Sequence, residues 1–392
     1  MLNFDFYAPA RILFGKDSHK QIGELLKPLT GKALLHYGGG SIKKNGIYDA
    51  VTASLAASGI SYVELGGVVP NPRLSLVHEG IALCREKGVD LILAVGGGSA
   101  IDSAKAIAMG AYYDGDVWDI YEQNKSIDKA LPVATILTIP AAGSESSGDT
   151  VITNEEKQLK LGYGSPRLRP LLSVINPEFF YTLPKNQIAN GVADMMSHVF
   201  ERYFTNTTHT DLTDGLCETV LRTIMRNAPI VLNDPADYDA WSEVGFGGTV
   251  AHNGLVGMGR AQDWACHMME HELSAIYDVA HGAGLAVLTP AWMEYVYRDN
   301  INMFVQFAVN VMGVDGSFRD PDAIVREGID RLRRFFRRME LPSTLSGLGI
   351  DGSRLEEMAK KATGAAFGEE YPIGGLKKLG WQDVLAIYKL AQ

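Results

Sequence analysis

The first third of the chain alternates short runs of β-forming residues with segments of helical periodicity. The runs LLHY (34–37), ISYVEL (60–65) and LILAV (91–95) are each followed by a helical pattern. Strands joined by crossover helices pair in parallel, and the helices cover the faces of the sheet. This alternation therefore predicts an α/β domain built on a parallel sheet.

The pattern changes near residue 185. Before that point, the opening FDFYAPARILFG contains a proline and suits an edge strand or a hairpin. After it, long helical stretches dominate, and 392 residues are more than one ordinary core holds. We therefore expect an α/β domain over 1–185 and an all-helical domain over 186–392, with helices over 189–204, 211–231, 240–257, 262–276, 299–312 and 322–339.

Composition excludes several classes of partner. A net charge of -10 argues against nucleic acid, and the chain lacks the run of about 18 apolar residues that a membrane span requires. The start has no basic region leading into an apolar run, so we expect no secretory signal. The cysteines are odd in number and scattered, which favours a reducing compartment. Together these features predict a cytoplasmic protein, with its cysteines at Cys84, Cys217 and Cys266.

Two Gly-Gly-Gly-Ser sequences directly follow predicted strands. Glycine lets the backbone approach a diphosphate, and the start of a helix presents free amide groups to the anion. A single copy is equally compatible with a tight turn that binds nothing. Two copies at the carboxyl ends of strands in one sheet favour a dinucleotide site. Its predicted residues are Gly38, Gly39, Gly40 and Ser41 in the first loop and Gly97, Gly98 and Ser99 in the second.

The first loop also bears on the cofactor. Lys43 stands where the usual GxGxxG fingerprint has its third glycine, and the loop has no acidic residue to bind a ribose 2′-hydroxyl. Ser41, Lys43 and Lys44 suit a 2′-phosphate instead, so we expect NADP(H) to be preferred over NAD(H). Two other residues keep two interpretations each. Asp102 either caps a helix or reaches the nicotinamide, and Thr138 begins a turn that either walls the nicotinamide or simply packs closely.

Histidines and one aspartate predict a metal centre in the second half. Asp194 and His198 are four residues apart, His267 and His271 repeat that spacing, and His281 follows closely. On a helix such pairs share one face. A lone pair is more often a surface contact, and a lone buried histidine a satisfied core residue, but their combination is hard to explain by packing. We expect Fe(II) or Zn(II) to be held by Asp194, His198, His267 and His281, with His271 beside it as a proton relay.

Nearly the whole chain resembles the iron-containing, group III alcohol dehydrogenases, specifically the NAD(P)H-dependent butanol dehydrogenase branch. The resemblance rests on FGKDS, YGGGSIKKNGIYD, PNPR, LAVGGGSAIDSAK, GSES, LPKNQIANGVADMMSH and HMMEHELSAIYDVAHG. It implies a Rossmann-like dinucleotide-binding domain and a helical metal-binding domain, arranged as in dehydroquinate synthase. It also implies a homodimer formed through the N-terminal edge strand, and further cofactor contacts from Asn71, Asp102, Thr138 and Lys160.

One position departs from the family pattern. Where the family commonly has a threonine in the sequence ATGSE, this chain has Ala142. A hydroxyl group is therefore missing beside the expected cofactor site, and with it any hydrogen bond that the threonine donates.

These features predict a metal-dependent alcohol dehydrogenase or aldehyde reductase for small substrates such as butanol and butanal. The metal would polarise the substrate oxygen while hydride passes to or from the nicotinamide, with His271 and Asp102 as candidate catalytic residues. The alternatives are a glycerol or polyol dehydrogenase, a dehydroquinate-synthase-like lyase, and a non-catalytic metal- or nucleotide-binding protein. A multiply anionic substrate would need basic residues near the metal. The segments 188–204 and 262–281 offer few, apart from Arg202.

Overall fold

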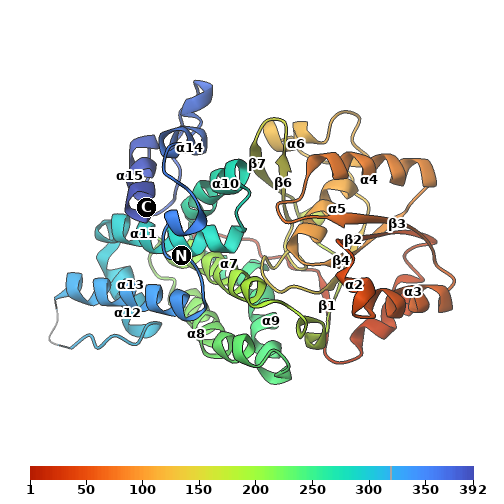
Figure 1. Ribbon diagram of the computed structural model, residues 1–392, viewed down its shortest axis with the longest axis horizontal. Coiled ribbons are helices and arrows are strands. Elements are labelled where there is room, and N and C mark those ends of the chain that lie inside the picture. The colour runs from red at the N-terminus through yellow and green to blue at the C-terminus, as the bar shows by residue number, and fades with distance from the viewer. Residues whose placement is uncertain (318–319) are drawn as a thin grey trace. The chain divides into compact units, whose positions relative to one another are not determined.

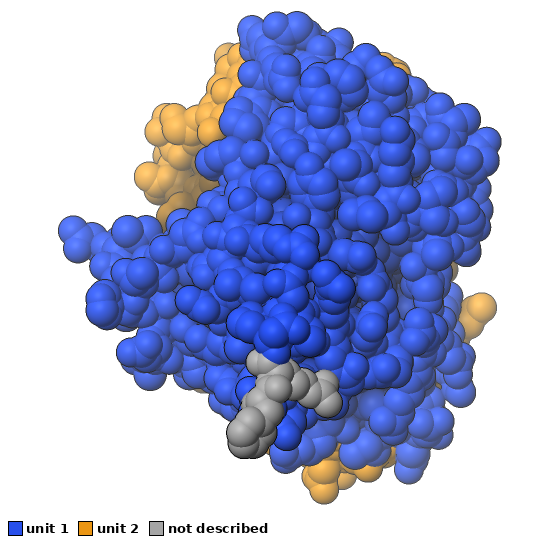
Figure 2. Space-filling view, turned by 90° about the vertical axis from the view of Figure 1, so that its left-hand side faces the viewer, with its two compact units in different colours: residues 1–6, 184–234, 246–392 blue, residues 7–183, 235–245 orange. Residues whose placement is uncertain are grey.

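The computed structural model describes residues 1–317 and 320–392, and the chain forms two compact units (Figures 1 and 2). The sheet unit comprises Tyr7–Leu183 and Pro235–Gly245. The helical unit comprises Met1–Phe6, Pro184–Asp234 and Phe246–Gln392, of which 318–319 lie outside the described residues. The main transition, between Leu183 and Pro184, lies next to the boundary expected from the sequence. Two short segments, 1–6 and 235–245, belong to the unit that their position in the sequence does not suggest.

The sheet unit contains a six-stranded parallel sheet with the order β1-β8-β5-β4-β2-β3. Its inner strands are nearly continuous apolar runs, because helices bury both of their faces. The opening segment supplies an edge strand, as predicted. The strands are β1 (Arg11–Phe14), β2 (Lys32–Gly38), β3 (Ser61–Val68), β4 (Leu91–Gly96), β5 (Val133–Leu137) and β8 (Leu172–Ile175).

Alternate strand residues point to opposite faces of this sheet. Leu35 and Leu93 pack in a core with Val51 of α3, whereas His36 contacts Ser103 of α5 through its imidazole ring. The helices of this unit are α1 (Ile22–Leu26), α2 (Ser41–Lys44), α3 (Ile47–Ala57), α4 (Leu74–Lys87), α5 (Gly98–Gly110) and α6 (Trp118–Glu122). A separate antiparallel hairpin, which the sequence did not predict, is formed by β6 (Asp149–Asn154) and β7 (Leu159–Gly164).

The helical unit is built around α7 and α11, which pack closely together. A Cβ atom on Gly282 would lie only 1.9 Å from the carbonyl oxygen of Asn190, so this close approach requires a glycine. The predicted helices are present, and α11, α14 and α15 are additions to them. They are α7 (Lys185–Tyr203), α8 (Asp211–Asn233), α10 (Ala265–Tyr277), α11 (His281–Val296), α12 (Ile301–Asn310), α13 (Pro321–Arg338), α14 (Leu355–Ala362) and α15 (Trp381–Ala391), while α9 (Tyr238–His252) contributes to both units.

Within residues 1–317 and 320–392, no helix is both long enough and apolar enough to cross a bilayer.

Candidate metal centre and cofactor loops

The four predicted metal ligands converge inside the helical unit. Asp194 Oδ1 lies 3.4 Å from His198 Nδ1, 3.8 Å from His267 Nε2 and 3.8 Å from His281 Nε2. One potential ligand atom from each of Asp194, His267 and His281 lies within 4.8 Å of the others. Tetrahedral coordination with bonds of about 2.0–2.1 Å places ligand atoms roughly 3.3 Å apart. Small side-chain movements would therefore bring the atoms of Asp194, His267 and His281 around one cation, whereas His198 lies close to Asp194 but outside this group of mutually close ligand atoms.

Three of these atoms are buried without a hydrogen-bond partner among the described residues: Asp194 Oδ1, His198 Nδ1 and His267 Nε2. A buried polar atom that lacks a partner costs free energy, so such atoms are rare unless an ion or water completes the site. One carboxylate and three imidazoles form a ligand set that suits Fe(II) or Zn(II). The residues present therefore fit a divalent transition metal.

The electrostatics of the cluster agree with this fit. Burial by itself raises the pKa of Asp194, but His267 and the other nearby histidines lower it overall. Burial and the neighbouring histidines push the pKa of His198 well below its ordinary value. Burial also works against protonation of His267, yet Asp194 and Glu201 raise its pKa to about 9. The cluster thus combines an ionised carboxylate and a neutral imidazole with a position that attracts positive charge.

Two carboxylates that were not predicted from the sequence contact histidines of the predicted metal site. Glu201 Oε1 accepts a hydrogen bond from His267 Nδ1 at 3.0 Å, and Glu270 Oε2 forms one with His281 Nδ1. Each glutamate follows a predicted ligand by three residues in the sequence, at a buried helical position. A charged residue on the apolar face of a helix was the available signal.

Two further histidines lie beside the cluster. The ring centre of His271 is 5.8 Å from that of His281, so His271 adjoins the predicted ligands, and its relay role stays a prediction. His252 was not selected, although its ring centre lies 4.1 Å from that of His198. No acidic residue or histidine lies four residues from His252 in the sequence, so helical spacing could not reveal it.

The two glycine loops lie at the carboxyl ends of neighbouring strands in the sheet unit. After β2 the chain crosses outward to β3 and then returns to β4 on the other side of β2. Ligands of open α/β sheets bind at such a switch point. Thr138 follows β5, the next strand, and donates its backbone N–H to the carbonyl oxygen of Gly96. Three successive strands thus bring predicted cofactor residues to one edge of the sheet.

The surroundings of the glycines differ between the two loops. A Cβ on Gly97 would lie 2.8 Å from Ile139 Cβ, and one on Gly98 would lie 2.9 Å from Ala142 Cβ. Packing alone therefore accounts for glycine in the second loop, and it places Ala142 directly beside that loop. In the first loop, a Cβ on Gly39 or Gly40 would meet no described atom within 4 Å. The first loop is thus the one whose glycines leave open space.

Lys43 in the first loop already has an anionic partner. Its Nζ lies 3.3 Å from Glu64 Oε2 and above the rings of Tyr37 and Tyr48. Glu64 also accepts hydrogen bonds from both tyrosine hydroxyls. Because Glu64 comes from β3, the sequence of the loop did not reveal it. The prediction of NADP(H) counted Lys43 as a free cation, whereas the structure pairs it with a carboxylate.

The remaining predicted cofactor residues are held by side-chain hydrogen bonds. Lys160 Nζ donates to Asn71 Oδ1 at 3.0 Å, which brings these two buried residues together. Asp102 does not cap α5; its carboxylate accepts hydrogen bonds from Ser144 Oγ at 2.5 Å and Val151 N at 3.0 Å. The nicotinamide role of Asp102 stays a prediction.

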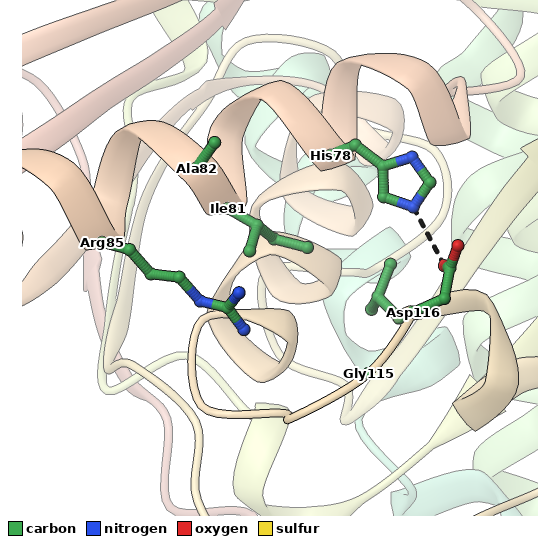
Figure 3. A pocket seen from close by; sticks show the side chains of 7 residues that line it. His78, Ile81, Ala82, Arg85, Gly115 and Asp116 are labelled. Atoms are coloured by element: carbon green, nitrogen blue, oxygen red, sulfur yellow. Dashed lines mark hydrogen bonds and ion pairs between the residues drawn. The ribbon is translucent and has the colours of Figure 1, made fainter.

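A separate pocket of about 410 Å³ lies between α4 and residues 115–117 (Figure 3). His78 Nε2 lies 2.9 Å from Asp116 Oδ1 there, and Arg85 donates to the backbone carbonyl oxygens of Gly110, Ala111 and Tyr113. None of the predicted site residues lines this pocket. It is therefore separate from the metal centre and the glycine loops.

The chain matches family models along almost its whole length. Residues 9–177 match the iron-containing alcohol dehydrogenase model, and residues 188–392 match the C-terminal model of the same family. The chain belongs to the iron-containing alcohol dehydrogenase family, and within it to the butanol dehydrogenase branch. This membership confirms the predicted family, the α/β and helical fold class, and the assignment as an oxidoreductase.

Some similar proteins are named for NADH and others for NADPH. The NADH-dependent butanol dehydrogenase A of Clostridium acetobutylicum is 46% identical over 390 residues, which are 99% of each chain. The NADPH-dependent aldehyde reductase YqhD of Escherichia coli is 38% identical over 92% of this chain and 93% of its own. The crystal structure of NADH-dependent butanol dehydrogenase A from Thermotoga maritima has a TM-score of 0.96 and 41% identity, and it covers 100% of this chain and 99% of its own. A nicotinamide cofactor is therefore common to these relatives, but some are named for NADH and others for NADPH.

Proposed function

We propose that this protein reduces small aldehydes such as butanal, and oxidises the corresponding primary alcohols, at a divalent metal held by Asp194, His198, His267 and His281. The observation that carries this proposal is the set of buried, unpartnered ligand atoms on three of these residues. The similarity to alcohol dehydrogenases and aldehyde reductases supports this reaction over the polyol dehydrogenase and lyase alternatives.

The bound metal supplies a Lewis acid for the substrate oxygen, and the nicotinamide supplies or accepts hydride. The chain's own residues do the rest. Asp194 provides the negative charge that retains a cation, and the buried histidines keep solvent away from it. We assign proton transfer to His271, which is partly exposed and adjoins His281. His271→Ala should remove one ionisation from the pH–rate profile, and an unchanged profile would refute that assignment.

The test is metal analysis combined with turnover. Protein purified without chelator should contain about one Fe or Zn ion per chain. It should oxidise NADH or NADPH in the presence of butanal, followed at 340 nm. Bound metal without turnover would instead support the non-catalytic alternative, and turnover that survives complete metal removal would refute the proposed centre.

The preference between NAD(H) and NADP(H) rests on the first glycine loop. Ser41, Lys43 and Lys44 support the predicted preference for NADP(H) over NAD(H). The partner of Lys43 supports the second candidate, NAD(H), because Glu64 neutralises that cation and would repel a 2′-phosphate. The NADH-dependent relatives point the same way. We therefore favour NADH, and the ratio of kcat/KM for NADH to that for NADPH decides between the two candidates.

Three broader features belong to the same proposal. Residues 1–185 supply most of the cofactor domain and 186–392 most of the metal domain, while 1–6 and 235–245 belong to the opposite units. The protein is a homodimer, which is supported by β1 at the edge of the sheet and by exposed apolar side chains nearby in the sequence. Its cytoplasmic location is supported by three free, buried cysteines. The exposed apolar side chains before β1 are Met1, Leu2, Phe4, Phe6 and Tyr7. Sedimentation velocity should show a dimer, and a monomer at micromolar concentration would refute the assembly.

A further inference from the structure

Two buried glutamates each bind one histidine of the metal centre from the side opposite Asp194. We propose that Glu201 and Glu270 are positioning residues, which fix the tautomer and ring orientation of His267 and His281 and thereby set the affinity for the metal. This inference rests on the proposed metal centre. Neither glutamate is assigned to bind the cation itself.

Glu201 joins α7 and α10, which are two of the three helices that carry the proposed ligands. It lies on α7 with Asp194 and His198, is 2% exposed, and accepts hydrogen bonds from both the ring Nδ1 and the backbone N–H of His267, each at 3.0 Å. The backbone N–H belongs to the first turn of α10, where amide groups have no partner within the helix. The same carboxylate oxygen therefore satisfies the start of α10 and orients the ring of its third residue.

Glu270 makes an equivalent contact with the third histidine. It lies on α10, is completely buried, and binds His281 Nδ1 through Oε2 and the hydroxyl of Ser274 through Oε1. The facing helix leaves room for it, because a Cβ on Gly284 would lie 2.8 Å from Glu270 Cγ and 2.9 Å from its Oε1. A glycine inside a helix lowers its stability. Its presence in α11 is explained by the space that this carboxylate occupies.

The effect on the ligands follows from imidazole chemistry. A neutral imidazole has one N–H group and one lone pair. When Nδ1–H donates to a carboxylate, the lone pair is on Nε2, which is the atom that faces Asp194 in both His267 and His281. Such a carboxylate also makes the ring a stronger base and a better ligand, and its loss typically weakens metal binding by about 10- to 100-fold.

The experiment measures Zn(II) affinity of the full chain by competition with a chromophoric chelator. Glu201→Ala and Glu270→Ala should each weaken binding by about 10- to 100-fold. The corresponding glutamine variants keep an oxygen acceptor and should recover part of that loss. Co(II) bound to the alanine variants should show a shifted visible absorption spectrum, because the ligand field depends on the ring orientation.

Glu272→Gln is the matched control. Glu272 lies on the same helix as Glu270 and is similarly buried, but its carboxylate pairs with Lys361 at 3.1 Å. This variant should lower the unfolding midpoint of the metal-free protein while it leaves Zn(II) affinity within about twofold of wild type. The comparison separates loss of a buried carboxylate from loss of a contact with a ligand.

Gly284→Ala provides a second test that keeps every charged group. The added methyl group would press on Glu270, so Zn(II) binding should weaken even though alanine favours the helix. If the glutamate variants fold and bind Zn(II) as tightly as wild type, the inference is wrong and the metal centre stands. If wild-type protein binds no divalent metal, the proposed centre fails and this inference fails with it.

Discussion

Two buried clusters of charged groups differ in one respect, namely whether the protein itself satisfies them. In the sheet unit, Lys105 is fully buried and donates to Ser144 Oγ, Ser147 O and Asp149 O at 2.7–3.0 Å. Asp102 accepts hydrogen bonds in the same network. In the helical unit, Asp194 Oδ1 and two imidazole nitrogens have no such partner among the described residues. Burial and charge are common to both clusters. What distinguishes the cluster in the helical unit is that three potential ligand atoms without hydrogen-bond partners in the described part of the chain lie close together there.

The pKa values of the two aspartates follow the same division. Burial raises the pKa of Asp102 to about 6, although Lys105 and hydrogen bonds act in the opposite direction. Burial lowers the pKa of Lys105 to about 8. By contrast, the surrounding histidines outweigh burial at Asp194 and lower its pKa. The network in the sheet unit thus disfavours full charge on its own members, whereas the cluster in the helical unit keeps a carboxylate ready for a cation.

Asp194→Asn should give the largest effect, because it removes the only anionic ligand of the proposed set. Turnover of butanal should fall by more than about 1,000-fold, which corresponds to more than about 4 kcal/mol in the activation barrier. Asparagine has nearly the same shape, so the metal-free protein should still fold, with a modest loss of stability because the attraction between the Asp194 carboxylate and His267 is removed. Metal content by elemental analysis and urea unfolding check both expectations. Retained metal and activity would show that the unsatisfied atoms do not mark the site.

Lys105→Met should have the opposite profile. Removing the cation leaves three buried acceptors without their donor, and the free energy of unfolding should fall by about 3–5 kcal/mol. Metal content should stay at the wild-type level, because the network lies in the other unit. Urea unfolding and elemental analysis measure the two quantities. Loss of metal without loss of stability would break the distinction between the clusters.

Local periodicity accounts for what the sequence predicted in the fold. The segments expected over 211–231 and 322–339 are helices at Asp211–Asn233 and Pro321–Arg338, because each has one apolar face. Helix α11 was missed because almost all of its residues are buried and apolar, so it has no amphipathic period, and it contains Pro290. The strand positions followed from apolar runs, but their order in the sheet depends on pairings between distant segments.

The candidate site shows the same limit. The spacing of Asp194 and His198 was visible because both residues lie on one helix face. The contacts of Glu201, Glu270 and Glu64 were not, because each depends on which elements pack together. Local sequence therefore indicated the chemistry of the proposed ligands, and only the packed structure showed the residues that support or neutralise them.

His36 extends the comparison to pH. Both ring nitrogens have partners, Leu65 O and Ser103 Oγ, each at 2.9 Å. Burial lowers the pKa of His36 to about 4, against an ordinary value of 6.5. The neutral ring is therefore favoured in the folded state, so its contribution is complete above about pH 6.5 and is lost as the pH falls toward 4. The loss should be about 3 kcal/mol in the free energy of unfolding.

Metal-free protein is the right sample for this test, because acid would also release a bound cation. Urea unfolding of wild type and His36→Gln should be compared at pH 7 and pH 4.5. The variant should be less stable at pH 7 but should lose less stability on acidification. An equal loss in both proteins would place the acid sensitivity elsewhere and would separate His36 from the self-satisfied groups.

Glu64→Gln should leave Lys43, in the first glycine loop, without its anionic partner. The substitution removes the counter-charge of Lys43 but preserves a side chain of the same size beside Tyr37 and Tyr48. Lys43 would then be available to a 2′-phosphate, and the ratio of kcat/KM for NADPH to that for NADH should rise. Because the pair is partly exposed, the expected change is only about two- to fivefold.

The matched variant is Lys43→Gln, which removes the cation and leaves the carboxylate. It should lower the NADPH to NADH ratio or leave it unchanged, and the double variant should return the ratio toward that of wild type. The effect should shrink as salt concentration rises, since it depends on an exposed charge. Suppose that Glu64→Gln leaves the ratio unchanged at low salt while Lys43→Gln lowers it. Lys43 would then act on the 2′-phosphate in spite of its contact with Glu64. The first glycine loop would then resemble the metal cluster, whose charged groups are available to a ligand, and not the network around Lys105.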